Sequence, residues 1–146
     1  MEIKDFIQIP YKWDGRDESG VDCYGLIVLW YKVKLRIELA DYPKADHGFN
    51  DCRDVGGFLI ENVWAEWNRI DVSEIRQNDV ILFYDDPGKD LHPSHIGVMI
   101  DKKHFLHSLQ QHGTATSRLR LWDKYIHSAY RHKAISNETD IHSEHI

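Results

Sequence analysis

The spacing of apolar residues predicts two helices in the first half of the chain. The run 23–35 places apolar side chains at the i, i+3, i+4 and i+7 positions of one buried helical face, namely Leu26, Leu29, Trp30 and Val33. Segment 56–70 repeats this spacing with Ile60, Val63, Trp64 and Trp67. Asp22 directly precedes the first run and is a residue type favoured at helix N-caps. We therefore expect helices over 23–35 and 56–70, with Asp22 capping the first.

Beyond residue 70 the pattern changes to short runs that are rich in β-forming residues and separated by turn residues. These runs are 79–84, 95–100, 104–109, 116–122 and 129–135. Their position after two helices indicates an α+β fold in which N-terminal helices pack on an antiparallel β-sheet meander. The stretch 136–146 is polar and lacks periodicity. We expect one domain over 1–135 followed by a flexible C-terminal tail over 136–146.

The composition is that of a folded acidic protein. Of the 146 residues 42% are hydrophobic, and five Trp, seven Tyr and five Phe supply ample apolar area for a core. The formal net charge of −6 and the lack of a visible Lys and Arg cluster argue against nucleic acid as a partner. No apolar run has the length that crosses a bilayer, and the first residues lack the order of a signal peptide. We expect neither membrane insertion nor a signal peptide.

Cys23 and Cys52 are the two cysteines of the chain, and we expect both to be reduced. Cys23 falls in the first turn of the predicted helix, where unpaired backbone N–H groups and the helix dipole favour an anion. Such a position, with a histidine neighbour, can lower a thiol pKa to roughly 3.5–7.5 and create a nucleophile. From its position alone, a small buried hydrophobic side chain explains Cys23 equally well. The role of Cys52, in or near a loop, stays open.

Two histidines have the spacing that would complete a nucleophilic site. His95 and His107 begin and nearly end a predicted hairpin, and an odd-numbered loop centred on Asp101 or Lys102 would make their rings opposed or diagonal neighbours on one face. His95 could then take the thiol proton while His107 fixes its tautomer. Because the chain has ten histidines, a chance pair of ordinary strand histidines is the alternative. A zinc site of Cys23, His95 and His107 ranks lower, since no local ligand pair supports it; we expect no metal and no cofactor.

The chain contains, in this order, the segments PYKWDGRDESGVDCYGL, IRQNDVILFY and SHIGVMIDKKHFLHS. Together they resemble the NlpC-type peptidases (the NlpC/p60 family), a papain-like superfamily of cell-wall cysteine hydrolases, and the resemblance covers residues 10–131. It implies the papain-like NlpC fold. It also implies that Cys23 is the nucleophile, His95 the general base and His107 the third polar residue that orients the base.

The same resemblance implies substrate-binding residues and shows departures from the family pattern. Asp22 matches an acidic residue that helps to hold substrate, and Tyr11 matches a tyrosine whose hydroxyl lies near the thiol. Tyr24 stands where most cell-wall members have serine, and we place it among the substrate-binding residues. Asp14 and Asn78 each replace a glycine of the family pattern.

An aromatic residue directly after the cysteine resembles the branch found in bacteriophage tail-tip proteins. This resemblance implies an enzyme that cleaves an amide bond in the peptidoglycan stem peptide. The enzyme would be made in the host cytoplasm and carried to the cell wall in a phage or prophage tail, with other tail proteins as partners. Two alternatives remain: a structural tail-tip component without hydrolase activity, and a deamidase or acyltransferase that uses the same three residues.

Overall fold

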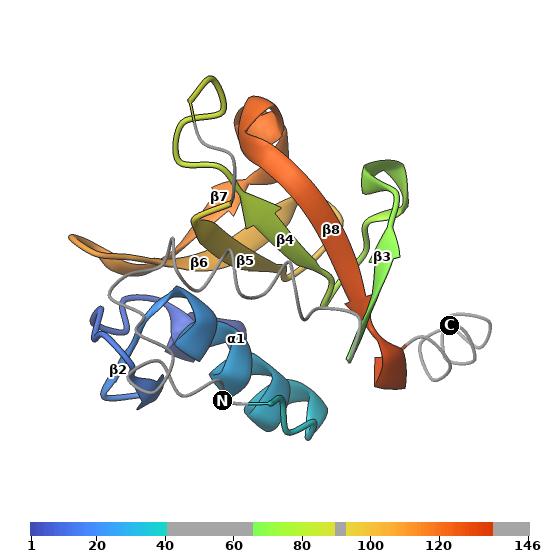
Figure 1. Cartoon of the computed structure of the whole chain (residues 1–146). Helices are drawn as coiled ribbons and strands as arrows, with labels where there is room; N and C mark the ends of the chain where they lie inside the picture. The colour runs from blue at the N-terminus through green and yellow to red at the C-terminus, as the bar shows by residue number, and fades with distance from the viewer. Residues whose placement is uncertain (41–65, 90–92, 136–146) are drawn as a thin grey trace.

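The computed structural model describes residues 1–40, 66–89 and 93–135. A six-stranded antiparallel sheet lies above an N-terminal segment that contains helix α1 (Cys23–Trp30) (Figure 1). The strands of this sheet, in the spatial order β3-β8-β4-β5-β6-β7, are β3 (Trp67–Ile70), β8 (Ile126–His132), β4 (Val80–Phe83), β5 (His95–Met99), β6 (His104–Leu109) and β7 (Gly113–Arg118). The N-terminal segment also contains η1 (Ile3–Phe6), the hairpin of β1 (Arg16–Asp17) and β2 (Gly20–Val21), and the π-helix η2 (Tyr31–Leu35). Within the described ranges no helix has the length and apolar character needed to cross a bilayer.

The predicted α+β class, with helix packed on an antiparallel sheet, is confirmed. Strands β4, β5, β6 and β7 follow one another as a meander. β8 departs from the prediction, because it crosses back to lie between β3 and β4 rather than beside β7 (Figure 1). Sequence order alone does not specify this return.

Two predicted strands have different boundaries in the structure. The predicted strand 116–122 is wrong after Arg118, where the chain turns into the 3-10 helix η5 (Leu119–Tyr125). The turn allows Trp122 to pack against the aromatic side chains of Phe83 and Phe105, with ring centroids 5.6 Å away in each case. The final strand begins at Ile126 and ends at His132, earlier than predicted at both ends.

Helix α1 begins where the sequence indicated. The carboxylate of Asp22 accepts a hydrogen bond of 2.7 Å from the backbone N–H of Gly25, so Asp22 is the N-cap. The expected single buried face is wrong, since α1 packs against β1, β2, β5 and β6 and is enclosed on nearly all sides. After Trp30 the helix widens into η2, and Arg36 ends it in the left-handed conformation at φ 55°.

The second predicted helix, over 56–70, lies mainly outside the described residues. Its last residues contradict the prediction, because Trp67–Ile70 forms strand β3 and pairs with β8. Trp67 still buries its ring, which lies 5.4 Å from Tyr31 and 5.0 Å from His132 between centroids. The edge strand β3 therefore buries the apolar side chain whose spacing had suggested a helix. Cys52 and the predicted tail 136–146 also lie outside the described residues.

A buried polar network fastens the end of the helical segment to the sheet. Arg131 donates to both carboxylate oxygens of Asp79, at 2.9 and 2.7 Å. Next to Asp79, the side-chain oxygen of Asn78 accepts a 3.0 Å hydrogen bond from Trp30, and its backbone oxygen accepts one from Tyr31. Asn78 and Asp14 adopt left-handed φ angles of 74° and 64°. Glycine would suit both positions, and Asn and Asp tolerate this conformation better than most residues.

Candidate active site

The backbone just before Cys23 is hydrogen-bonded to both the N-terminal segment and β6. The backbone of Val21 pairs with the neighbourhood of Tyr11, with Val21 N–H donating to the Pro10 carbonyl at 3.0 Å. The carbonyl of Val21 accepts a 2.9 Å hydrogen bond from the hydroxyl of Ser108, on β6. Two residues after Val21, Cys23 thus starts α1 beside the strand that carries His107.

Cys23 is a reduced thiol whose side chain is 1% exposed. It belongs to the apolar cluster between α1 and the sheet, together with Ile96, Val98 and Leu106. The carboxylate of Asp22 beside it is fully buried and accepts hydrogen bonds from the backbone of Gly25 and Asp14, at 2.7 and 2.9 Å. Burial raises the pKa of Asp22, while the Arg16 guanidinium, 3.1 Å away, acts in the opposite direction.

His95 and His107 meet in the structure as the hairpin prediction required. Nε2 of His95 lies 2.8 Å from Nδ1 of His107, and the two rings are tilted by 64°. The β5–β6 register pairs Val98 with Leu106 and Met99 with Phe105, so the histidines are diagonal neighbours on one face. The prediction of adjacent rings is confirmed. It depended only on the even separation of the two residues and on the hairpin between them.

The hydrogen bonds continue from His107 to Ser117 on β7. Nε2 of His107 lies 2.9 Å from the hydroxyl oxygen of Ser117. If His107 donates its Nε2 proton to Ser117, its Nδ1 is an acceptor, and His95 must donate from Nε2. Nδ1 of His95 then carries a lone pair. Of the neutral tautomers that keep the hydrogen bond between His95 and His107, only this pair leaves Nδ1 of His95 able to accept a further proton.

Burial favours the neutral form of both histidines. It lowers the pKa of His95 to about 4. It lowers the pKa of His107 to about 3, with a further contribution from the charge that His95 would carry. Both imidazoles are therefore uncharged near neutral pH, which is the form that can act as a base.

Aromatic side chains enclose the histidine pair on the face of the sheet away from α1. The ring of Trp122, from η5, lies edge-on to His107 with centroids 5.2 Å apart, and 6.4 Å from the ring of His95. The ring centroids of Phe105 and His107 are 4.6 Å apart, and those of Phe83 and His95 are 6.0 Å apart. These rings hold both imidazoles in place and exclude water from one side of them.

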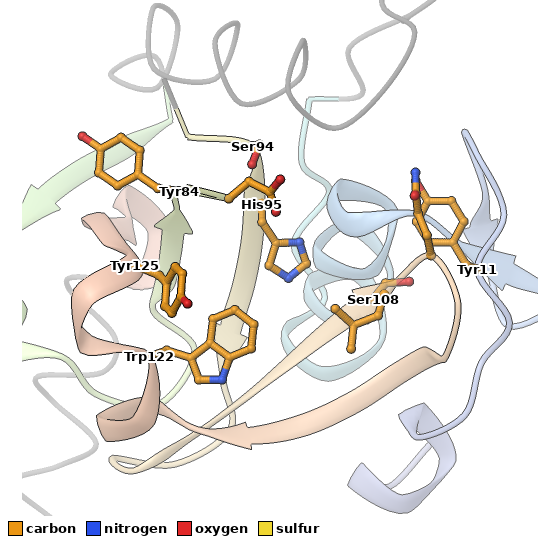
Figure 2. A pocket seen from close by; sticks show the side chains of 10 residues that line it. Tyr11, Tyr84, Ser94, His95, Ser108, Trp122 and Tyr125 are labelled. Carbon is orange, nitrogen blue, oxygen red and sulfur yellow. The ribbon is translucent and has the colours of Figure 1, made fainter. Parts of the chain in front are cut away.

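A cavity of about 610 Å³ opens in front of His95. In Figure 2, His95 lies between Trp122 and Tyr125 on one side and Ser108 and Tyr11 on the other. The remaining lining residues are Tyr84, Asp85, Ser94, Leu109 and Gln110. Cys23 is not among the lining residues. The cavity extends from His95 to Tyr11, whose segment pairs with Val21.

The residues that the sequence singled out occupy different environments. Tyr11 lines the cavity. Asp22 is buried as the helix cap, and Tyr24 lies in the core with its hydroxyl donating to the Ala40 carbonyl at 2.6 Å. The positions of Asp22 and Tyr24 do not support direct contact with substrate, and their role in substrate binding stays a prediction.

Sequence reasoning missed Ser117 and Trp122. Ser117 pairs with Phe105 across β6 and β7, so it shares a face with His107 and is its diagonal neighbour. Correct register across the 110–112 turn would have identified it. Trp122 was hidden because its segment was expected to be a strand. Among the residues that the structure describes, no group of three His, Cys, Asp or Glu side chains is arranged to hold a metal ion.

Comparison with known proteins places this geometry in a family. The model of the NlpC/P60 family matches residues 8–131. No curated protein sequence matches the chain. Among solved structures, the NlpC/p60 domain of the peptidoglycan hydrolase SagA is 18% identical, with a TM-score of 0.56 over 88% of this chain and 91% of that one.

Two longer proteins show the same fold. An NlpC/P60 family protein from Bacillus cereus ATCC 10987 is 21% identical, with a TM-score of 0.62 over 88% of this chain and 37% of that one. NlpC2 from Trichomonas vaginalis is 20% identical, with a TM-score of 0.63 over 88% of this chain and 44% of that one. This chain therefore spans less than half the length of these two proteins.

Proposed function

Because the chain belongs to the NlpC/P60 family, we propose that it is a cysteine peptidase or amidase that hydrolyses an amide bond in the peptidoglycan stem peptide. The observation that carries the proposal is the chain of hydrogen bonds from His95 through His107 to Ser117, at 2.8 and 2.9 Å, beside a cavity. A relay that fixes one imidazole tautomer is what a thiol nucleophile needs from its base.

In the proposed reaction, Nδ1 of His95 takes the proton of the Cys23 thiol, and the thiolate attacks the substrate carbonyl. The tetrahedral intermediate collapses when the His95 imidazolium gives its proton to the leaving amine, which breaks the C–N bond. Water then loses a proton to His95 and attacks the thioester, releasing the acid and restoring the thiol. The backbone N–H of Cys23, at the start of α1, would help to stabilise the oxyanion.

The proposal requires Sγ of Cys23 to approach Nδ1 of His95. One feature supports this approach: Ser108, next to His107 on β6, donates to the carbonyl of Val21, two residues before Cys23. Cys23 is 1% exposed and does not line the cavity, so the proposal also requires a movement that brings the thiol and the substrate carbonyl together. Tyr11 lines the cavity, which supports its proposed contact with substrate.

We also propose that the enzyme works as part of a phage or prophage tail that delivers it to the cell wall. The support is the aromatic Tyr24 directly after the cysteine. In the structure Tyr24 packs in the core, with the Arg16 guanidinium 5.7 Å from its ring. A serine there would lose this packing, so the residue at this position affects how the start of α1 is held.

The decisive experiment compares the full chain with Cys23→Ala and Cys52→Ala on purified peptidoglycan, measuring new amino groups and released peptides. We expect release by the parent and by Cys52→Ala, and none by Cys23→Ala. No release by the folded parent would favour a structural tail component. Ammonia without new peptide ends would identify a deamidase, and equal release by parent and Cys23→Ala would remove the proposed nucleophile.

A further inference from the structure

A second cavity lies on the other side of η5 from the histidine pair, and basic side chains surround it. Its volume is about 420 Å³. Lys102 and Lys103 reach it from the turn between β5 and β6, Arg118 from the end of β7 and Arg120 from η5. Its other lining residues are Val72, Leu119 and Asp123. Segments that are distant in the sequence thus bring four cations together, which the sequence alone did not show.

The positive charge of this basic cavity is largely uncompensated. Four cations face one carboxylate, that of Asp123, although the whole chain has a net charge of −6. In the described part of the chain, no ion pair joins any of the four cations to an acid. The nearby Asp101 is engaged elsewhere, accepting from the backbone N–H groups of Lys103 and His104, each at 2.7 Å. Like charges repel, so a bound anion would lower the electrostatic energy of this arrangement.

We propose that the basic cavity binds a short phosphate chain, either an oligophosphate or a phosphodiester-linked polymer that carries no bases. Two guanidinium groups can each hold phosphate oxygens in a bidentate manner, and the two ammonium groups add point charges. The excess of three positive charges is more than a ligand with a single carboxylate would neutralise. Val72 and Leu119 offer an apolar surface to the carbon linkers of a phosphodiester chain.

The lining argues against nucleic acid as the occupant. Proteins that bind single strands combine a basic groove with aromatic rings on which bases stack. No aromatic ring lines this cavity, and its cations are gathered at one place rather than along a stripe. A chain of phosphates without bases fits both facts.

The basic cavity and the histidine site share η5 as a common wall. Arg120 and Asp123 face the basic cavity, whereas Trp122 and Tyr125 line the cavity in front of His95. Arg118 directly follows Ser117, the partner of His107. An anionic polymer held at the basic cavity would therefore keep the catalytic face close to the material that contains the polymer. This binding site goes beyond the proposed hydrolysis and does not depend on it.

Isothermal titration calorimetry of the full chain with tripolyphosphate tests the site. The variant Arg118→Gln/Arg120→Gln removes both guanidinium groups, and Lys32→Gln/Lys89→Gln, at exposed positions elsewhere, makes the same change in net charge. We expect saturable binding by the parent, a loss of about tenfold or more in affinity for the arginine variant, and little change for the lysine control. Circular dichroism confirms that the variants are folded.

Three further outcomes decide the ligand class. Citrate, which carries several carboxylates, should bind more weakly than tripolyphosphate, and so should a short single-stranded oligodeoxynucleotide at equal phosphate concentration. The absence of saturable binding by the parent, or equal losses in the two variants, would overturn the site. Citrate or the oligonucleotide binding as tightly as tripolyphosphate would overturn the assignment to base-free phosphate chains. Peptidoglycan hydrolysis is measured separately, so its failure would leave this result unaffected.

Discussion

Replacing Ser117 by alanine tests whether the hydroxyl beyond the histidine pair selects the reactive tautomer. The change removes the partner that lies 2.9 Å from Nε2 of His107 and leaves the rest of the site in place. His107 can then place its proton on Nδ1 and donate to His95. In that arrangement Nδ1 of His95 carries a proton, and the ring cannot accept one from the thiol.

The size of the effect follows from the energy of one hydrogen bond. A net contribution of about 1 kcal/mol favours the productive tautomer pair about fivefold, and about 1.4 kcal/mol favours it tenfold. We therefore expect kcat to fall by at most about five- to tenfold, the limit reached if the unproductive pair predominates without the hydroxyl. KM should be nearly unchanged, since Ser117 does not line the substrate cavity. Ser117→Thr keeps the hydroxyl and should retain most of the activity. Thr116→Ala, on the opposite face of β7, is the matched control and should have no effect.

Two measurements check this reasoning. Steady-state kinetics on a soluble stem-peptide substrate gives kcat and KM, and nitrogen NMR of labelled histidine identifies which ring nitrogen of His95 and His107 carries a proton. In the parent both rings should carry the proton on Nε2, and in Ser117→Ala part of the population should move it to Nδ1. Parent-like kcat in Ser117→Ala, or a Thr variant as impaired as the Ala variant, would refute the tautomer role.

Three predictions concern stability. Burial lowers the folded-state pKa values of His95 and His107 from 6.5 to about 4 and about 3, so the unfolded chain binds more protons below pH 6.5. The contribution of the two neutral histidines to the free energy of unfolding is complete above pH 6.5 and is lost as the pH falls toward 4 and 3. Urea unfolding should therefore give a lower free energy of unfolding at pH 5 than at pH 7.5. An equal value at both pH values would contradict the lowered pKa values. Arg131→Met leaves the Asp79 carboxylate buried without its 2.7 Å partner. We expect the free energy of unfolding, measured with denaturant, to fall by about 3–5 kcal/mol, and the double variant Arg131→Met/Asp79→Leu to recover part of this loss. Equal stability of Arg131→Met and the parent would exclude a stabilising role for the pair. Gly97→Ala places a methyl group 2.7 Å from an aromatic ring and should cost about 1–3 kcal/mol by thermal melting, whereas an unchanged melting temperature would show that the ring moves aside freely.

The sequence predicted those parts of the molecule that depend on local pattern. Asp22 as a cap, the start of α1 and the pairing of His95 with His107 all follow from residues close together in the chain. The return of β8 beside β4 and the edge position of Trp67 depend on packing between distant segments, which local patterns do not contain. Short apolar runs are also ambiguous between helix and strand, so Trp67 was assigned to the wrong element.

The candidate site shows the same division. Its two histidines were found from spacing, whereas Ser117 and Trp122 required the register and the turn after β6. Of the predicted substrate contacts, Tyr11 lies on the cavity and Tyr24 lies in the core. Residues in a cavity are selected by three-dimensional packing, and a motif match does not reveal which side of a helix start faces the opening.

The hydrogen bond between Ser108 and Val21 joins residues 87 positions apart. The thiol and the imidazoles consequently lie on segments that are far apart in the sequence and meet only when the chain between them has folded. A nascent or partly unfolded chain would hold the sulfur without its base, and its capacity to cut amide bonds would arise in a single late step. Temperature or urea should therefore abolish turnover and native tryptophan emission along the same curve, with no half-active form between them.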